Sequence, residues 1–390
     1  MSCNEWQKVK LGDLIESISV KHSFNKNKLI FLNTSDILEG KVLHNNYSDI
    51  EGLPGQAKKS IKKDDILFSE IRPKNKRFAY VDFDSDDYVV STKLMVLRKK
   101  SNNINNRYLY YYLTSDKTLN YLQTIAEGRS GTFPQITFNE LKIIEIDLPP
   151  IEEQEKIANI LSSLDDKIEL NNEMNKTLEE MAQCIFKRWF VDFEFPSEDG
   201  KPYKSSGGEM VDSELGMIPK GWEVKQLGEV IKITSGKRPK NKSKDKNEEY
   251  DTPIIGASSI MGYTNDFLYN ERILVIGRVG THGVVQRFKS KVWTSDNTFV
   301  IKSETYEYIN QILKSIDYSS LNRGSTQPLI TQTDIKNVLI VYPKYELLNK
   351  FENITSELLN RVEFNLENNI MLSNLRDSLL PKLMSGEIKV

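Results

Sequence analysis

The sequence predicts an α+β protein made of two tandem globular domains, each followed by a long α-helix, with the two helices pairing as an antiparallel coiled coil. Two observations lead to this fold class. Short stretches of the 390-residue chain recur at constant distances, and two long stretches carry the apolar spacing of a coiled-coil helix. The repeat is far longer than the roughly 20–50 residues of solenoid proteins, so a whole module has been duplicated.

One motif marks the start of each module. The stretch "EWQKVKLGDLIES" lies near the N-terminus, and "GWEVKQLGEVIKI" lies beyond the middle of the chain. Trp6 matches Trp222 and Gly12 matches Gly228, and both pairs are 216 positions apart. A shared tryptophan and a shared glycine at one offset indicate that the two stretches open equivalent domains.

A second motif closes each globular domain. The stretches "SGTFPQITFNELKIIEIDLPP" and "GSTQPLITQTDIKNVLIVYPK" match at an offset of 194 residues, and the same offset holds through the helix that follows each of them. The matched helix positions pair Ile157, Leu164, Ile168, Leu178 and Ile185 with Phe351, Leu358, Val362, Leu372 and Leu379. The offset is smaller than at the start of the modules because the second copy lacks some loop residues.

The globular parts alternate short strands with turns and contain a helix. "DDILFSEIRP" and "YVVSTKLMVLRK" in the first copy, and "ERILVIGRVG" and "NTFVIKS" in the second, are rich in β-branched and aromatic residues. "NRYLYYYLTSDKTLNYLQTI" has a helical pattern. Strands and helices in one segment predict α+β domains with curved sheets.

The long helices begin near prolines. Pro150 and Pro343 suit a first helical turn, and the acidic residues of "IEEQEK" favour the positive end of the helix dipole. The first helix has a coiled-coil seam at Ile157, Leu161, Leu164, Ile168, Asn171, Asn175, Leu178, Ala182 and Ile185. Such a narrow apolar stripe needs a partner, and the second helix is the obvious one.

Two asparagines lie in this seam, and the 194-residue offset repeats them. Asn171 matches Asn365, and Asn175 matches Asn369. A buried asparagine lowers stability but specifies register when it meets another polar group. In an antiparallel pair with pseudo-two-fold symmetry, Asn171 would face Asn369 and Asn175 would face Asn365. Alternatively, the stripe drifts around the helix and the asparagines are exposed.

A segment rich in Gly, Ser, Pro and acidic residues, "FEFPSEDGKPYKSSGGEMVDSELGMIPKGW", separates the modules and is typical of a linker. The predicted order is therefore a first globular domain, a central long helix, a linker, a second globular domain and a C-terminal long helix. Their predicted ranges are 1–148, 149–192, 193–218, 219–343 and 344–390.

Composition narrows the class of protein. The formal net charge is −2, so a nucleic-acid surface would have to be a local patch. The two cysteines are far apart and predict a reduced, intracellular protein without a disulfide framework. The N-terminus has no signal-peptide pattern, and no run of 18 apolar residues exists, so we expect a cytoplasmic protein without a membrane span.

The combined motifs resemble a known family. The helix start "IEEQEKI", the central "KRWFVDFEFP", the opening "WQKVKLGD" and the terminal "LPKLMSGEI" are similar to the specificity subunit (HsdS) of type I restriction–modification systems. The resemblance covers essentially the whole chain, and the duplicated architecture makes it specific.

This resemblance implies a function. Such subunits carry two target-recognition domains, each of which reads one half of a bipartite, asymmetric DNA target, and the coiled coil sets the spacer between the halves. The family implies partners: double-stranded DNA, two modification (methyltransferase) subunits docked on this chain, and restriction subunits in the full complex. The chain itself would have no catalytic site, no metal and no cofactor, with S-adenosylmethionine expected on the methyltransferase subunit.

Basic and polar loops are the candidate DNA contacts, because Lys and Arg neutralise phosphates while Arg, Asn and Gln reach base edges. In the first domain they are Arg72, Lys74, Asn75, Lys76, Arg77, Arg129, Ser130 and Thr132. In the second domain they are Lys237, Arg238, Lys240, Lys242, Arg278, Thr281, His282, Arg323, Ser325, Thr326 and Gln327. A basic cluster of this kind can equally be a solvated loop, and the repeated Thr and Pro can simply shape a turn.

The motifs do not match those of a DNA-modifying or metal-dependent enzyme. A methyltransferase needs an Asn/Asp-Pro-Pro-aromatic motif, which "DLPP" is not, and "TSGKRPK" lacks the P-loop spacing. His22, His44 and His282 form no metal-ligand pattern with the distant cysteines. An orphan or phase-variable specificity subunit, or a coiled-coil adaptor that does not read DNA, remains open as an alternative.

Overall fold

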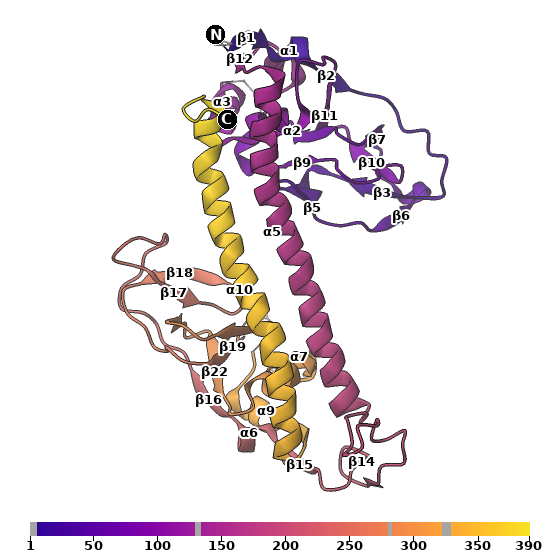
Figure 1. The fold of residues 1–390 in the computed structure, drawn as a ribbon, viewed down its shortest axis with the longest axis vertical. Coiled ribbons are helices and arrows are strands. Elements are labelled where there is room, and N and C mark those ends of the chain that lie inside the picture. The colour runs from indigo at the N-terminus through magenta and orange to yellow at the C-terminus, as the bar shows by residue number, and fades with distance from the viewer. Residues whose placement is uncertain (1–5, 129–133, 280–282, 322–328) are drawn as a thin grey trace. The chain divides into compact units, whose positions relative to one another are not determined.

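The computed structural model describes residues 6–128, 134–279, 283–321 and 329–390, which form two compact units (Figure 1). Unit 1 comprises Met1–Leu170 and Asn368–Val390, and unit 2 comprises Asn171–Glu367. The chain passes from one unit to the other inside two long helices, α5 (Ile151–Phe186) and α10 (Tyr345–Met384). The predicted α+β class with two tandem domains and two long helices is confirmed.

The globular part of unit 1 contains short strands, short helices and a helical pair. Its strands are β1 (Gln7–Lys10), β2 (Ile15–Ile18), β3 (Lys28–Leu32), β4 (Ile37–Leu38), β5 (Lys41–Val42), β6 (Tyr47–Asp49), β7 (Ala57–Ser60), β8 (Ile66–Ser69), β9 (Phe78–Tyr80), β10 (Tyr88–Ser91), β11 (Leu94–Lys99) and β12 (Glu145–Leu148). Its helices are α1 (Leu11–Leu14), α2 (Asn106–Thr114), α3 (Asp116–Glu127) and α4 (Phe138–Leu141), with 3-10 turns η1 (Thr34–Asp36), η2 (Ile50–Gly52) and η3 (Pro73–Asn75).

Unit 2 contains a shorter version of the same set. Its strands are β13 (Met210–Val211), β14 (Ile218–Pro219), β15 (Glu223–Gln226), β16 (Lys232–Ser235), β17 (Thr252–Ile255), β18 (Ile260–Thr264), β19 (Ile273–Gly277), β20 (Val285–Phe288), β21 (Trp293–Thr294), β22 (Thr298–Lys302) and β23 (Leu339–Tyr342). Its helices are α6 (Leu227–Val230), α7 (Tyr306–Ser315), α8 (Tyr318–Leu321) and α9 (Gln332–Lys336), and a π-helical segment, η4 (Lys187–Val191), extends α5.

The two units share one sheet topology. The order β2-β11-β8-β9 in unit 1 recurs as β16-β22-β19-β20 in unit 2. The terminal pair β1–β12 recurs as β15–β23, and both units contain one parallel pair, β3 with β10 and β17 with β21. The duplication read from the sequence is therefore also a duplication of topology.

The repeated glycine is required by a close approach of two chain segments. A Cβ atom on Gly12 would lie 2.7 Å from the carbonyl oxygen of Lys142, just after α4. On Gly228 it would lie 2.8 Å from the Cβ atom of Lys336, at the end of α9. Since no side chain fits at such distances, the first motif keeps glycine in both copies.

In each unit the long helices share the core of the globular part. Ile157 and Leu161 of α5, together with Leu383 of α10, are buried in the main core of unit 1. Phe186 of α5 and Phe351 of α10 are buried in the main core of unit 2. Burying one such side chain stabilises a fold by about 1.5–3 kcal/mol, so each domain is anchored firmly on the helix segments of its own unit.

The two helices run antiparallel within each unit. In unit 1, the guanidinium Nη1 of Arg376 donates to Oδ1 of Asp165 at 2.6 Å. In unit 2, Ala182 packs with Leu359 and Val362. Within each of these units, residues late in one helix contact residues early in the other, as an antiparallel pair requires.

The asparagine pair inside unit 2 is confirmed. Nδ2 of Asn365 donates to Oδ1 of Asn175 at 2.8 Å, and the two side chains are only 1% and 7% exposed. Asn171 is also buried. The alternative prediction, in which the seam asparagines are exposed to solvent, is therefore wrong for Asn171, Asn175 and Asn365. The pair Asn171–Asn369 would join the two units and stays a prediction.

Replacing Asn365 by leucine should destabilise unit 2 by about 1–3 kcal/mol, because Oδ1 of Asn175 would be buried without its donor. Replacing both asparagines by leucine should recover most of that loss, since a polar pair in a seam specifies register at the expense of stability. Urea unfolding of the full chain measures both effects. Asn353→Leu, at an exposed position of α10, is the control; a single variant at position 365 that is as stable as this control would contradict the prediction.

The segment predicted as a linker is structured. β13 pairs with β14, and the Phe195 ring stacks on the rings of Tyr203 and Trp222, with centroids 4.6 and 5.0 Å away. Gly208 lies so close to Tyr203 that an added Cβ atom would overlap its ring. This segment therefore packs against the globular part of unit 2.

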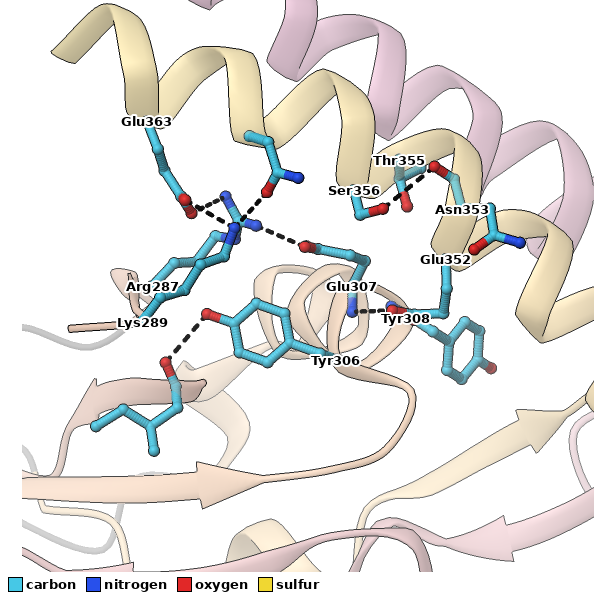
Figure 2. Close-up of polar contacts among 12 residues, drawn as sticks. Arg287, Lys289, Tyr306, Glu307, Tyr308, Glu352, Asn353, Thr355, Ser356 and Glu363 are labelled. Carbon is cyan, nitrogen blue, oxygen red and sulfur yellow. Dashed lines mark hydrogen bonds and ion pairs between the residues drawn. The ribbon is translucent and has the colours of Figure 1, made fainter. Parts of the chain in front are cut away.

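A polar cluster attaches α7 to α10 in unit 2 (Figure 2). The carboxylate of Glu352 accepts the backbone N–H groups of Glu307 and Tyr308 at 3.0 and 2.8 Å, and so caps the N-terminus of α7. Arg287 on β20 contacts Glu307 at 2.6 Å and Glu363 at 3.0 Å. These contacts fix one helix and one strand of the globular part on the long helix.

This cluster predicts a pH dependence of stability. Burial raises the pKa of Glu352 to about 7, above the usual value near 4.5. Between these values the folded state binds more protons than the unfolded chain, so the free energy of unfolding should fall as pH rises from about 5 to about 7. Glu352→Gln should flatten this slope in denaturant unfolding at a series of pH values. Glu346→Gln, at an exposed site on α10, should keep the wild-type slope; an unchanged slope in Glu352→Gln would contradict the assignment.

Candidate nucleic-acid interface

In unit 1, three chain segments meet where strand β8 ends. The N–H of Glu70, directly after β8, donates to the carbonyl of Lys93 in the β10–β11 turn at 3.1 Å. The carbonyl of Glu70 accepts the N–H of Ile136, in the segment before α4, at 2.8 Å. Glu70 thus ties the turn after β10 and the segment that follows the "RSGTFP" loop to the end of the central sheet.

Unit 2 has the same arrangement at the end of β19. The N–H of Arg278 donates to the carbonyl of Asn297 at 3.0 Å, and its own carbonyl accepts the N–H of Ile330 at 3.0 Å. Arg278 therefore holds the position of Glu70, and Asn297 holds the position of Lys93. The backbone scaffold is duplicated, whereas the side chains on it differ in charge and hydrogen-bonding capacity.

A fourth segment lies at the same end of each sheet. In unit 2, the N–H of Lys237, just after β16, donates to the carbonyl of Thr294 at 2.9 Å. In unit 1, Lys21 follows β2 and forms an isolated β-bridge with Lys59. Since β2 and β16 occupy equivalent places in their sheets, Lys21 is the counterpart of Lys237.

In the predicted basic cluster of unit 1, some side chains are exposed and others contact neighbouring groups of the protein. Arg72, Lys74 and Asn75 are exposed on the turn around η3. Lys76 contacts the carboxylates of Glu39 and Asp116 at 3.9 and 3.4 Å, and Arg77 donates to the carbonyls of Ser35 and Ile37 at 2.8 and 3.1 Å. Arg77 thus holds neighbouring backbone in place, which is a structural contribution to the loop.

The backbone of this turn is strained. Arg72 and Lys76 both have positive φ angles, 46° and 53°, which residues other than glycine rarely adopt. Strain of this kind costs about 1–3 kcal/mol and persists where the surrounding contacts impose it. The N–H of Arg72 donates to the carbonyl of Pro134 at 3.0 Å, which supplies one such contact.

The predicted residues of unit 2 are likewise divided. Lys237, Lys240 and Arg238 are exposed, and the guanidinium of Arg238 pairs with Asp296 at 2.6 Å. The guanidinium of Arg278 is half-buried, 5.6 Å from the centre of the Phe299 ring. Lys242 is exposed in the loop that leads to β17.

Several predicted contacts lie outside the described residues. They are Arg129, Ser130, Thr132, Thr281, His282, Arg323, Ser325, Thr326 and Gln327. Described residues beside these segments are held by β-bridges: Gln135, after 129–133, pairs with Ile71, and Val279, before 280–282, pairs with Leu329, after 322–328.

Three exposed residues at these sheet ends were missed by sequence reasoning: Lys21, Lys93 and Asn297. A signal existed for the first, since Lys21 and Lys237 are separated by the same 216 residues as the two opening tryptophans. For Lys93 and Asn297 the only shared signal is a serine two positions earlier in each copy, Ser91 and Ser295. That signal is too weak to find them without the fold.

No metal-binding cluster accompanies these loops in the described part of the chain. Among the residues placed by the structure, no group of three or more His, Cys, Asp and Glu side chains could hold a metal ion. In the same described ranges, none of the helices has the length and apolarity that crossing a bilayer requires. What these loops offer is a set of cations and amides on a fixed scaffold.

Comparison with known proteins connects this scaffold with a family. The family described as the type I restriction modification DNA specificity domain matches residues 4–180 and again residues 219–368. The specificity subunit of the type I restriction enzyme HindI from Haemophilus influenzae is 31% identical to this chain, over 99% of the chain and 100% of the relative. The MjaIX specificity subunit from Methanocaldococcus jannaschii is 32% identical over 73% of the chain and 69% of the relative. Among solved structures, the type I restriction–modification S subunit from M. genitalium shares the fold, with a TM-score of 0.61 at 16% identity, over 98% of this chain and 97% of that one.

Proposed function

Because the chain belongs to the family of type I restriction–modification DNA specificity proteins, we propose that it selects the DNA sequence on which its partner enzymes act. Each globular domain reads one half of a bipartite, asymmetric target. One observation carries this proposal: both units present the same backbone scaffold at the end of the same sheet, but with different side chains on it. A shared scaffold suits two half-sites on one duplex, and different side chains suit two different sequences.

The basic residues at the sheet ends have the role of phosphate contacts in this proposal. Lys74 in unit 1 and Lys237 and Lys240 in unit 2 are exposed cations that can neutralise phosphates and fix the register of the protein on DNA. Arg72, Asn75 and the loops at 129–133, 280–282 and 322–328 complete the proposed interface. Lys76 and Arg77 contribute chiefly by shaping the turn, since both are engaged by neighbouring groups.

The partners in this proposal follow from membership of the family. Recognition alone modifies nothing, so two methyltransferase subunits dock on this chain and carry S-adenosylmethionine, and restriction subunits join them in the full complex. The long helices set the distance between the two domains and hence the spacer between the half-sites. The chain acts in the cytoplasm as a non-catalytic subunit.

The proposal is tested by expressing the chain with the methyltransferase encoded beside it and reading modified bases across the host genome by single-molecule sequencing. A split motif with an unspecified spacer, absent when this chain is deleted, is expected. A stable complex that adds no methylation would overturn the proposal. It would leave an orphan specificity subunit or a coiled-coil adaptor that does not read DNA.

A further inference from the structure

We propose that Asn297 and Lys93 are equivalent base-reading residues, and that Asn297 recognises an adenine in one half-site while Lys93 recognises a guanine in the other. This inference rests on the proposed DNA-recognition function. It adds residues that neither repeat motif marks, and it assigns each of them a base by its hydrogen-bonding groups.

Hydrogen bonds from neighbouring segments hold the backbone of the turn that carries Asn297. The hydroxyl of Thr298 donates to the carbonyl of Ser295 at 2.7 Å, and the N–H of Ser295 donates to the carbonyl of Ile255 on β17 at 2.9 Å. The carbonyl of Asn297 accepts the N–H of Arg278. Thr294, Ser295 and Thr298 are all buried, so packing adds to these hydrogen bonds in constraining the backbone of the turn.

Unit 1 supports Lys93 in a different way but at the same place. Nζ of Lys59 donates to the carbonyls of Thr92 and Leu94, on either side of Lys93, at 3.1 and 2.7 Å. The N–H of Lys93 donates to Oγ of Ser91 at 3.2 Å, and its carbonyl accepts from Glu70. Burial lowers the pKa of Lys59, which fits an amine committed to the backbone of the turn.

The side chains on these turns are available for a ligand. Asn297 and Lys93 are exposed, and within the described ranges neither side chain has a hydrogen-bond or ion-pair partner. The neighbouring carboxylate of Asp296 is neutralised by Arg238 at 2.6 Å. A phosphate backbone can therefore approach the Asn297 turn without meeting an unpaired negative charge.

The chemistry of the two side chains points to different bases. An asparagine amide offers one acceptor and one donor in the spacing of adenine N6 and N7, whereas a lysine ammonium offers only donors and suits O6 and N7 of guanine. One such contact discriminates against the wrong base by about 1–3 kcal/mol. Preorganised turns favour this discrimination, because little backbone freedom is lost on binding.

Single-molecule methylation sequencing of variant complexes tests the assignment. Asn297→Ala should relax the preference at one adenine position of one half-site by about tenfold to a hundredfold and leave the other half-site unchanged. Lys93→Ala should relax one guanine position of the other half-site. The controls are Asn270→Ala and Lys63→Ala, exposed positions that precede β19 and β8 and so lie at the opposite ends of these strands. Both controls should keep the full motif.

Three outcomes would overturn the inference. Methylation that falls uniformly over all sites, with base preferences intact, would make these residues phosphate contacts. Variants indistinguishable from wild type would place the two turns outside the interface. Relaxation of the same half-site by both variants would contradict the equivalence of the turns. Failure of the proposed function itself looks different, because the wild-type chain would then direct no split motif at all.

Discussion

Arg287→Ala is expected to lower the free energy of unfolding of unit 2 by about 3–5 kcal/mol, because it leaves a buried carboxylate without its counter-charge. Glu307 is 0% exposed, and its Oε1 lies 2.6 Å from Nη2 of Arg287. The same guanidinium contacts Glu363 on α10 at 3.0 Å (Figure 2). Burial already raises the pKa of Glu307, and Arg287 is the group that opposes this shift most strongly. Without Arg287, Glu307 must take up a proton or be exposed to water.

Denaturant unfolding of the full chain measures this loss, and the structure offers a matched control. Arg238 also pairs with an aspartate at 2.6 Å, but its side chain is 85% exposed. Arg238→Ala should therefore change stability by about 0–1 kcal/mol. The double variant Arg287→Leu with Glu307→Leu should recover much of the loss, since apolar side chains often replace a buried ion pair without penalty. Equal stability of Arg287→Ala and Arg238→Ala would contradict the account.

The second large effect concerns the DNA target. Insertion of four residues after Glu173 and four after Glu367 should lengthen the spacer of the recognised sequence by one or two base pairs. Both positions are helical and match at the 194-residue offset, and both lie near the points where the chain passes between the units. Four residues add roughly 6 Å to a helix, and successive base pairs are about 3.4 Å apart. The original target should no longer be methylated.

The control insertion adds the same four residues to the exposed loop at 245–249 of unit 2, which should leave the spacer unchanged. Methylation sequencing of both variants gives the spacer directly. If the helix insertion preserved both half-sites and the original spacer, the long helices would not set the distance between the recognised sequences.

The parts of the fold that depend on local spacing were predictable from the sequence. A constant offset of 194 residues predicted the antiparallel helices and the contact between Asn175 and Asn365, because helical periodicity and duplication together specify which residues meet. The sequence shows that Gly12 and Gly228 are shared by the two copies. Only the fold explains why glycine is required there, because Gly12 closely approaches Lys142 and Gly228 closely approaches Lys336.

Contacts between distant segments were not predictable in this way. In the sequence, Arg77 resembles any other cation of a basic loop. Only the fold shows that its guanidinium donates hydrogen bonds to the carbonyls of Ser35 and Ile37. Lys93 and Asn297 lie in short turns with no marked composition, and they became candidates because backbone bonds place them beside Glu70 and Arg278. Sequence periodicity describes elements, whereas a recognition surface is assembled from the ends of several elements.

The central claim is that each unit reads its own half of the target, and a domain exchange tests it most directly. Residues 219–343 would be replaced by the corresponding domain of a relative with a different target, and the methylated motif would be read by single-molecule sequencing. The account predicts that one half-site changes to that of the relative, while the other half-site and the spacer stay the same. A chimera that assembles with its methyltransferase but changes both half-sites, or neither, would contradict it.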